Sequence, residues 1–118
     1  KFDECTLSPL YLEAAKPAKF PFPLTQYFQV RLKGRYEKLT GKAIVQVLVD
    51  ARGRACCRRI VSQNKQLRLD ILDLPGFIRR MPAWTPAQDQ GAPVNFALLL
   101  NFEFAGGTLT VVPVPRKE

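Results

Sequence analysis

The sequence predicts an α+β fold, with a three- to four-stranded antiparallel sheet and two helices packed on one face of it. Three patterns predict this class. Apolar residues recur at helical spacing from Leu24 to Tyr36. The stretch 42–61 alternates on both sides of a turn that contains Gly53, which is typical of a β-hairpin. The stretch 94–104 alternates as well, which indicates a sheet covered by helices on one side.

The composition is that of one globular domain. Of the 118 residues, 47% are hydrophobic and 24% are charged, and these fractions are ordinary for a folded protein. No apolar run approaches the ~20 residues that a helix needs to cross a bilayer. We divide the chain into an arm (1–23), a domain (24–104) and a tail (105–118). Because the chain begins at Lys1 rather than Met, we expect it to be part of a longer protein.

The arm and the first helix are read from prolines and apolar spacing. We expect a short helix over Leu7–Ala15, followed by an extended stretch over 16–23, which is too rich in proline for a helix. That stretch is either the end of a proline-rich linker or a segment laid over the core. A helix is expected from Thr25, its cap, to about Lys38, with one row of residues facing the core: Leu24, Phe28, Leu32 and Tyr36.

Further along, strands are expected over Lys42–Asp50 and Arg54–Val61, joined by a turn in which Gly53 takes positive φ. The stretch 62–80 is expected to form two short helices, because Pro75 and Gly76 interrupt it.

The last strand is expected over 94–104, with alternate residues on opposite faces. The sequence Ala105-Gly106-Gly107 can then turn the chain back, so that Thr108–Val112 forms a fourth strand beside it. A frayed terminus is the alternative for these tail residues.

Between the second helical region and the last strand lies the most distinctive motif of the chain. The only Met and the only Trp stand three residues apart within Met81-Pro82-Ala83-Trp84-Thr85-Pro86, and Gly91 and Pro93 follow. The prolines end the helix and hold the chain extended. We therefore interpret Trp84 as a core anchor, packed where a helix gives way to a strand.

The three cysteines, Cys5, Cys56 and Cys57, contain no CxxC spacing, and the chain has no His, so no zinc site is predicted. Adjacent residues of a strand point to opposite faces. Cys5 could therefore form a disulfide with Cys56 or with Cys57, in an oxidising compartment. Three reduced, partly buried thiols are the alternative.

The formal net charge is +8, and the basic residues are spread along the chain rather than gathered in a block. We interpret them as a solvated basic surface, with attraction to an anionic polymer or membrane as the alternative. No recognition helix is visible, so no nucleic-acid partner is predicted. Nor is an enzyme predicted, because the chain has no His, no Gly-rich phosphate loop and no paired carboxylates, and no cofactor or metal is expected.

The order of these motifs resembles the C-terminal domain of TonB-type energy transducers. The resemblance rests on GKAIVQVLVDARG at 41–53, MPAWTPA at 81–87, GAPV at 91–94 and NFEF at 101–104. The chain departs from the family pattern in lacking a Gly-Gly before its first helix and a Tyr-Pro after it. Its second helical region is interrupted at Pro75, and its tail continues past the usual last strand.

The resemblance implies a mechanical function in the periplasm. Such a domain is linked to an anchor in the inner membrane, which a motor complex moves, and it grips a peptide segment of an outer-membrane transporter. The grip is β-augmentation, in which the peptide pairs with a free edge strand. Here that edge would be the last strand, with a binding set of Val94, Asn95, Phe96, Ala97, Leu99, Asn101 and Glu103.

Two further readings stay open. A domain of the same fold could instead be a static adaptor that binds peptidoglycan, a membrane surface or a fixed protein partner. A homodimer is also left open. If Thr108–Val112 folds back, it would cover the proposed edge, and binding would then require its displacement or another surface.

Overall fold

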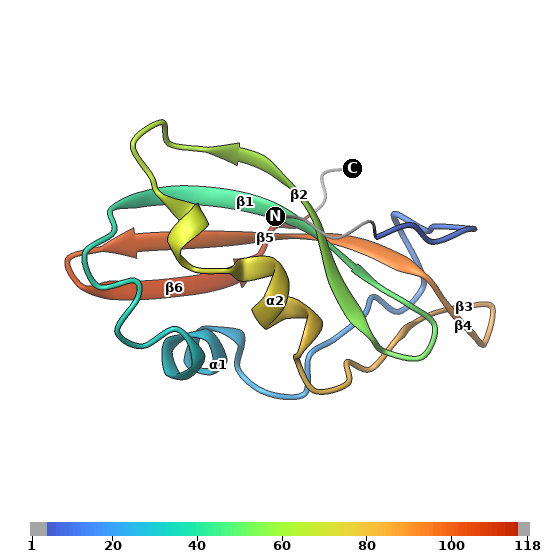
Figure 1. The fold of residues 1–118 in the computed structure, drawn as a ribbon. Coiled ribbons are helices and arrows are strands. Elements are labelled where there is room, and N and C mark those ends of the chain that lie inside the picture. Colours follow the sequence, from blue (N-terminus) through green and yellow to red (C-terminus); the bar gives the residue numbers. More distant parts are fainter. Residues whose placement is uncertain (1–4, 116–118) are drawn as a thin grey trace.

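The protein has an α+β fold with a four-stranded antiparallel sheet, a separate two-stranded sheet and two helices (Figure 1). We describe residues 5–115 of a computed structural model. The strands of the large sheet lie in the order β2-β1-β5-β6. Their bounds are Gly41–Val49 for β1, Ala55–Gln63 for β2, Phe96–Ala105 for β5 and Thr108–Pro113 for β6. The small sheet pairs β3 (Ala87–Asp89) with β4 (Ala92–Val94).

One face of the large sheet carries the main hydrophobic core. Alternate residues of β1 and β5 point to this face because side chains alternate along a strand, and α1 and α2 cover it (Figure 1). The α1 residue Phe28 is fully buried, and its ring lies 5.1 Å from that of Phe102 in an edge-on arrangement. The buried residues that β1 and β5 contribute to this core are Ala43, Val45, Val47, Val49, Leu100, Phe102 and Phe104.

The helices are shorter than predicted. Helix α1 spans Leu24–Arg31, with Pro23 rather than Thr25 at its cap position, and the turn that follows contains Gly34 at φ 87°. Among residues 5–115, no helix is long and apolar enough to cross a membrane.

The second helical region is interrupted as predicted, but not at Pro75. A 3-10 turn, η1, covers Leu69–Ile71, and α2 covers Leu74–Arg79. Asp73 lies at the break in left-handed backbone, and its side chain accepts a hydrogen bond from the Gly76 N–H at 3.3 Å. Pro75 therefore lies in the first turn of a helix, where its missing N–H costs nothing.

The predicted last strand is divided, and its location was predicted wrongly. Val94 ends β4, Asn95 lies between the strands, and β5 begins at Phe96. Strand β5 is not an edge: it pairs with β1 along Phe96–Phe104, and its second half pairs with β6 from Leu100 onward. The fourth strand predicted for the tail is confirmed, and it covers the edge that the sequence analysis assigned to a partner peptide.

The outer side of β6 is closed in turn by side chains of α1. The Thr25 hydroxyl donates to the Val111 carbonyl at 3.0 Å and accepts from the Val111 N–H at 2.9 Å. The Gln29 amide donates to the Leu109 carbonyl at 2.9 Å. Because these backbone groups are the ones that an added strand would use, this part of β6 is not open to β-augmentation.

Replacing Thr25 with valine is expected to lower the free energy of unfolding by about 1–2 kcal/mol, since it leaves a part-buried N–H and C=O of Val111 without their partner. Denaturant unfolding measures the loss, and hydrogen exchange of β6 amides is expected to speed up. Gln26→Ala, at an exposed position of the same helix, is the matched control. Equal stability of the two variants would contradict the role assigned to the hydroxyl.

The other outer strand, β2, is irregular and basic. Its pairing with β1 shifts register twice, and Arg58 and Val61 have no register partner. Such bulges, together with the exposed Arg58 and Arg59, are features that discourage edge-to-edge pairing.

The arm is extended, so the helix predicted over Leu7–Ala15 is wrong. It begins behind the sheet, where Cys5 is bonded to Cys56 of β2 with a Cα–Cα distance of 6.1 Å. Cys5 belongs there to a small second cluster with Leu48 and Ala97, on the face opposite the helices. Of the two pairings left open by the sequence, the structure has Cys5–Cys56, and the Cys57 thiol is buried in the main core.

Candidate peptide-binding groove

The predicted binding residues do not share one accessible surface. Asn101 and Glu103 lie in the half of β5 that β6 pairs with. Phe96 and Ala97 are buried, and Leu99 is partly buried. The structure therefore brings together only the first part of this set, at the end of the sheet that β6 does not reach.

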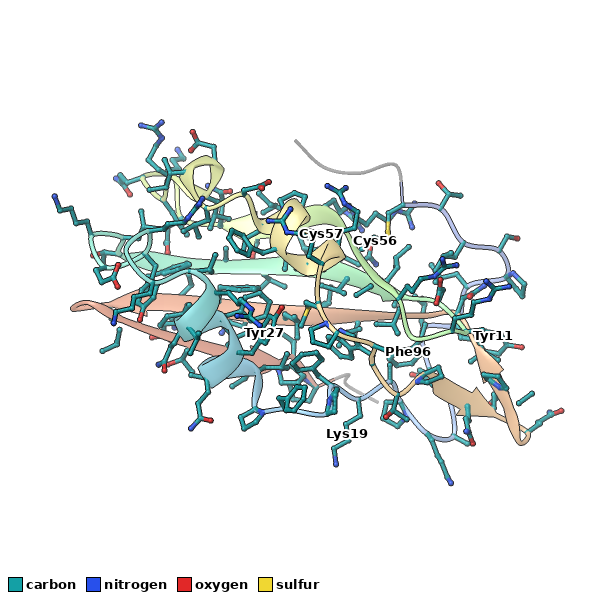
Figure 2. All side chains as sticks on the ribbon, turned by 60° about the horizontal axis from the view of Figure 1, so that its bottom comes forward. Tyr11, Lys19, Tyr27, Cys56, Cys57 and Phe96 are labelled. Carbon is teal, nitrogen blue, oxygen red and sulfur yellow. A yellow bond between two sulfur atoms is a disulfide. The ribbon has the colours of Figure 1, made fainter. Side chains whose placement is uncertain are left out.

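At that end, the residues predicted to hold a foreign strand hold the arm of the same chain. Tyr11 forms a parallel bridge with Phe96: its N–H donates to the Asn95 carbonyl at 2.8 Å, and its carbonyl accepts from the Ala97 N–H at 2.9 Å. The Asn95 side chain donates to the Pro9 carbonyl at 3.0 Å and accepts from the Ala51 N–H at 3.0 Å. Figure 2 shows Tyr11 and Phe96 together at this end of the sheet.

A large open groove lies beside this first half of β5, with a volume of about 810 Å³. Its residues come from three separate segments of the chain. The first segment is the arm with the start of α1, and it contributes Leu12, Glu13, Ala14, Pro17, Ala18, Lys19, Phe20, Phe22 and Leu24. The second is β5 with the connector, by which we mean the segment between α2 and β5, and it contributes Trp84, Phe96, Leu98 and Leu99. The third is the tail, which contributes Pro113, Val114 and Pro115. We call it the arm–tail groove. Its size and apolar lining are typical of binding sites.

The polar groups of the groove are few. Glu13 and Lys19 supply one charge of each sign, and both are exposed on the arm; Figure 2 shows the Lys19 side chain pointing away from the body of the protein. Exposed apolar rings and chains lie on the groove as well: Phe22 is 55% exposed and Leu12 is 51% exposed. The groove can therefore bury apolar side chains of a partner while leaving charged groups in water.

Trp84 lies between the groove and the core, and it is the anchor that the sequence predicted. It is only 3% exposed and belongs to the main core. The backbone N–H of Trp84 donates to the Gly53 carbonyl at 2.8 Å, so the hairpin turn holds Trp84 in place. The Phe20 ring of the arm lies 5.3 Å from it. The buried indole Nε1 of Trp84 has no hydrogen-bond partner among residues 5–115.

The other residues of the motif around Trp84 also lie in the connector. Met81 is buried, whereas Pro82 is exposed and Pro86 is half-buried. Gly91 is exposed at φ 79° in the turn between β3 and β4. Pro93 pairs in register with Gln88. These residues belong to the segment that leads from α2 into β5.

The turn that holds Trp84 depends on a carboxylate. Partial burial would raise the pKa of Asp50, but hydrogen bonds from the backbone N–H groups of Arg54 and Arg52 and from the Arg54 side chain outweigh it and hold this pKa below its ordinary value. The ionised form therefore stabilises the turn, and this contribution is lost as the pH falls through the acid range.

Two other features of the surface lie outside the arm–tail groove. A smaller cavity of about 280 Å³ lies between β2 and α2, beside Ile60 and Leu74. At the ends of the helices, the guanidinium carbons of Arg35 and Arg80 lie 5.2 Å and 5.0 Å from the centre of the Phe77 ring. Within the described part of the chain, no three His, Cys, Asp or Glu side chains are grouped so that they could hold a metal ion.

Sequence reasoning missed most of the groove. The stretch 16–23 was predicted to be extended, as the end of a linker or as a segment laid over the core, and no binding role was predicted for it or for residues 113–115. A signal was present, because Phe22 and the two final prolines are apolar residues with no place in a helical or strand pattern. Comparison with models of protein families, with curated proteins and with solved structures finds no match for this chain.

Proposed function

We propose that this protein is a periplasmic protein-binding domain of a TonB-like energy transducer, and that it holds an extended peptide segment of an outer-membrane transporter in the arm–tail groove. The observation that carries the proposal is the groove itself, which is large, mostly apolar and located at Phe96–Leu99. It adjoins the stretch of chain that resembles the TonB family most closely.

The proposed binding place is the groove, and not the strand edge that β-augmentation would use. Strand β6 pairs with β5, and α1 contacts the outer side of β6. A peptide in the groove would instead gain affinity mainly by burying apolar side chains, at roughly 25 cal/mol per Å² of apolar surface removed from water. Lys19 and Glu13 at the surface would favour a peptide with charged residues beside its apolar ones.

Tension on the bound peptide would be carried by a firmly attached structure. The floor of the groove belongs to β5, which pairs with β1 from Phe96 to Phe104. This continuous ladder resists local unfolding, which is what a domain that transmits force needs.

The proposal is tested by titrating the protein with synthetic peptides that cover the periplasmic N-terminal segments of outer-membrane transporters. We expect saturable binding, and a loss of about tenfold in affinity for Phe22→Ala, because a groove-lining ring would no longer be buried against the peptide. Calorimetry or the fluorescence of Trp84 follows the titration.

Val30→Ala is the matched control, since Val30 is an exposed apolar residue, 67% accessible, on α1 and outside the groove. Its affinity is expected to equal that of the wild type. No binding of any peptide, or equal losses in the two variants, would contradict the proposal.

A static adaptor at an anionic surface is the second candidate. Arg35 and Arg80 favour it, because both lie against Phe77 and neither forms a salt bridge within residues 5–115. Binding to vesicles that contain anionic lipid, weakened by salt and by Arg35→Ala, together with no peptide binding, would favour this function over the first.

A further inference from the structure

We infer that the arm is a displaceable strand that covers Trp84 and the backbone of residues 85–97, and that the Cys5–Cys56 disulfide keeps it closed. The inference rests on the proposed function in one respect, namely that the occupant which displaces the arm is an extended peptide. The structural part, a latched arm over Trp84, stands on separate observations.

The first observation is that the arm occupies backbone positions that an incoming strand could use. The N–H and C=O groups of Lys16 exchange two hydrogen bonds with Gln88, at 3.0 Å and 2.8 Å, and Lys19 does the same with Thr85, at 3.0 Å and 2.8 Å. With the Tyr11 bridge to Phe96, the arm forms three separate points of strand-like pairing along 85–97. The body of the protein thus presents a surface that accepts an extended chain, and it is filled by a segment of its own.

The second observation concerns what the arm covers. Phe20 is 5% exposed, and its ring is 5.3 Å from that of Trp84. The Trp84 indole N–H is buried, and within the described part of the chain it has no hydrogen-bond partner. A buried donor without a hydrogen-bond partner is unfavourable, so the closed arrangement is less stable than its apolar contacts alone would make it. An occupant that offers a carbonyl oxygen after the arm moves would recover this loss.

The third observation is the way the arm is fastened. Its first described residue is tied to β2 behind the sheet, whereas Lys16, Lys19 and Phe20 contact the connector and Trp84 on the helix side. The arm therefore wraps around the end of the sheet and is fixed on both sides, by the disulfide and by α1. Fixing both ends keeps the local concentration of the arm at its seat high. A dithiol reductant, itself oxidised to a disulfide, would convert Cys5–Cys56 to two thiols; the Cys5 side of the arm is then released, and exchange with a partner strand becomes easier.

The occupant that fits is an extended peptide with an apolar residue to replace Phe20. The backbone groups of Thr85 and Gln88 specify a main-chain partner and no particular side chain, while the site beside Trp84 specifies an apolar one. The redox state of one bond would then set how readily the peptide enters.

Two opposed variants test the inference in the full chain. The variant Cys5→Ser with Cys56→Ser removes the latch. The variant Lys16→Cys with Gln88→Cys adds a second one: this antiparallel pair exchanges both hydrogen bonds, so its Cα atoms are about 5.5 Å apart, within the range of disulfides. Lys16→Ser with Gln88→Ser is the matched control. Circular dichroism checks that each variant is folded.

Trp84 gives a readout that does not depend on peptide, because it is the only tryptophan of the chain. We expect acrylamide to quench its fluorescence more strongly in the unlatched variant than in the oxidised wild type, and no more strongly in the doubly latched one. Peptide affinity is expected to rise about tenfold without the latch and to fall about tenfold with the added bond, relative to the serine control.

The outcomes separate the two claims. Quenching and affinity that are equal in the doubly latched variant and its serine control would overturn the inference, even if the unlatched variant failed to fold. Stronger quenching of the unlatched variant with no binding of any peptide would support the displaceable arm and count against the proposed function. Peptide binding that all variants share equally would support the groove and overturn the latch.

Discussion

Replacing Gly53 with alanine is expected to lower the free energy of unfolding by about 3 kcal/mol. Gly53 has φ 88°, a region that costs an L-residue with a Cβ about 1–2 kcal/mol. An added Cβ would also press into the Trp84 carbonyl oxygen, far inside normal contact distance, and overpacking of this kind costs about 1–3 kcal/mol. Because Trp84 donates to the Gly53 carbonyl, the change would also displace the groove residue that the turn holds.

Denaturant unfolding measures the loss, and Trp84 fluorescence reports the displacement. Arg52→Ala, in the same turn but exposed, is the control and is expected to change stability by less than about 0.5 kcal/mol. A Gly53→Ala variant as stable as this control would show that the turn does not hold Trp84 in the way described.

Removal of the disulfide is expected to destabilise the protein by about 4 kcal/mol. The two cysteines are 51 residues apart, and a cross-link that closes a loop of this length restricts the unfolded chain by about that amount. The arm would also lose its attachment behind the sheet, where Cys5 packs with Leu48 and Ala97.

The comparison is between the wild type and Cys5→Ser with Cys56→Ser, each unfolded with and without a reductant. The reductant is expected to destabilise the wild type and to leave the double variant unchanged, which makes the variant its own control. A wild type whose stability does not respond to the reductant would contradict a disulfide between these two cysteines.

The elements that the sequence predicts well are those set by nearby residues. The hairpin is one, because the alternation of β1 and β2 and the positive φ of Gly53 both follow from local chemistry. The fourth strand is another, since two glycines at 106–107 allow the tight return that pairs β6 with β5. The burial of Trp84 also followed from its position between prolines.

The errors come from long-range contacts that local patterns do not contain. A short helix was predicted over Leu7–Ala15, but hydrogen bonds to residues 85–97 hold the arm extended instead. An alternating strand covered on one side looks the same at an edge and in the middle of a sheet, so the alternation in β5 could not reveal that β6 lies beside it. A continuous strand over 94–104 was expected, but Asn95 uses its side chain to join the arm and the hairpin turn.

The candidate site also depends on contacts between distant segments, which local sequence patterns do not contain. Its walls are contributed by 12–24, by 84–99 and by 113–115, and only the folded chain brings these segments together. Binding was predicted along the whole of 94–104, whereas the groove adjoins only the first half of β5. Asn95, Phe96 and Ala97 contact an extended segment, and in this structure that segment is the arm.

The most direct test of the binding place is to map amide chemical shifts of the labelled protein during titration with a transporter peptide that binds. We predict the largest changes at groove residues Leu12, Phe22, Leu98 and Val114. Changes concentrated instead at Arg59, Ser62 and Gln63, along the outer strand β2, would show that the peptide adds to a free sheet edge and would contradict binding in the arm–tail groove.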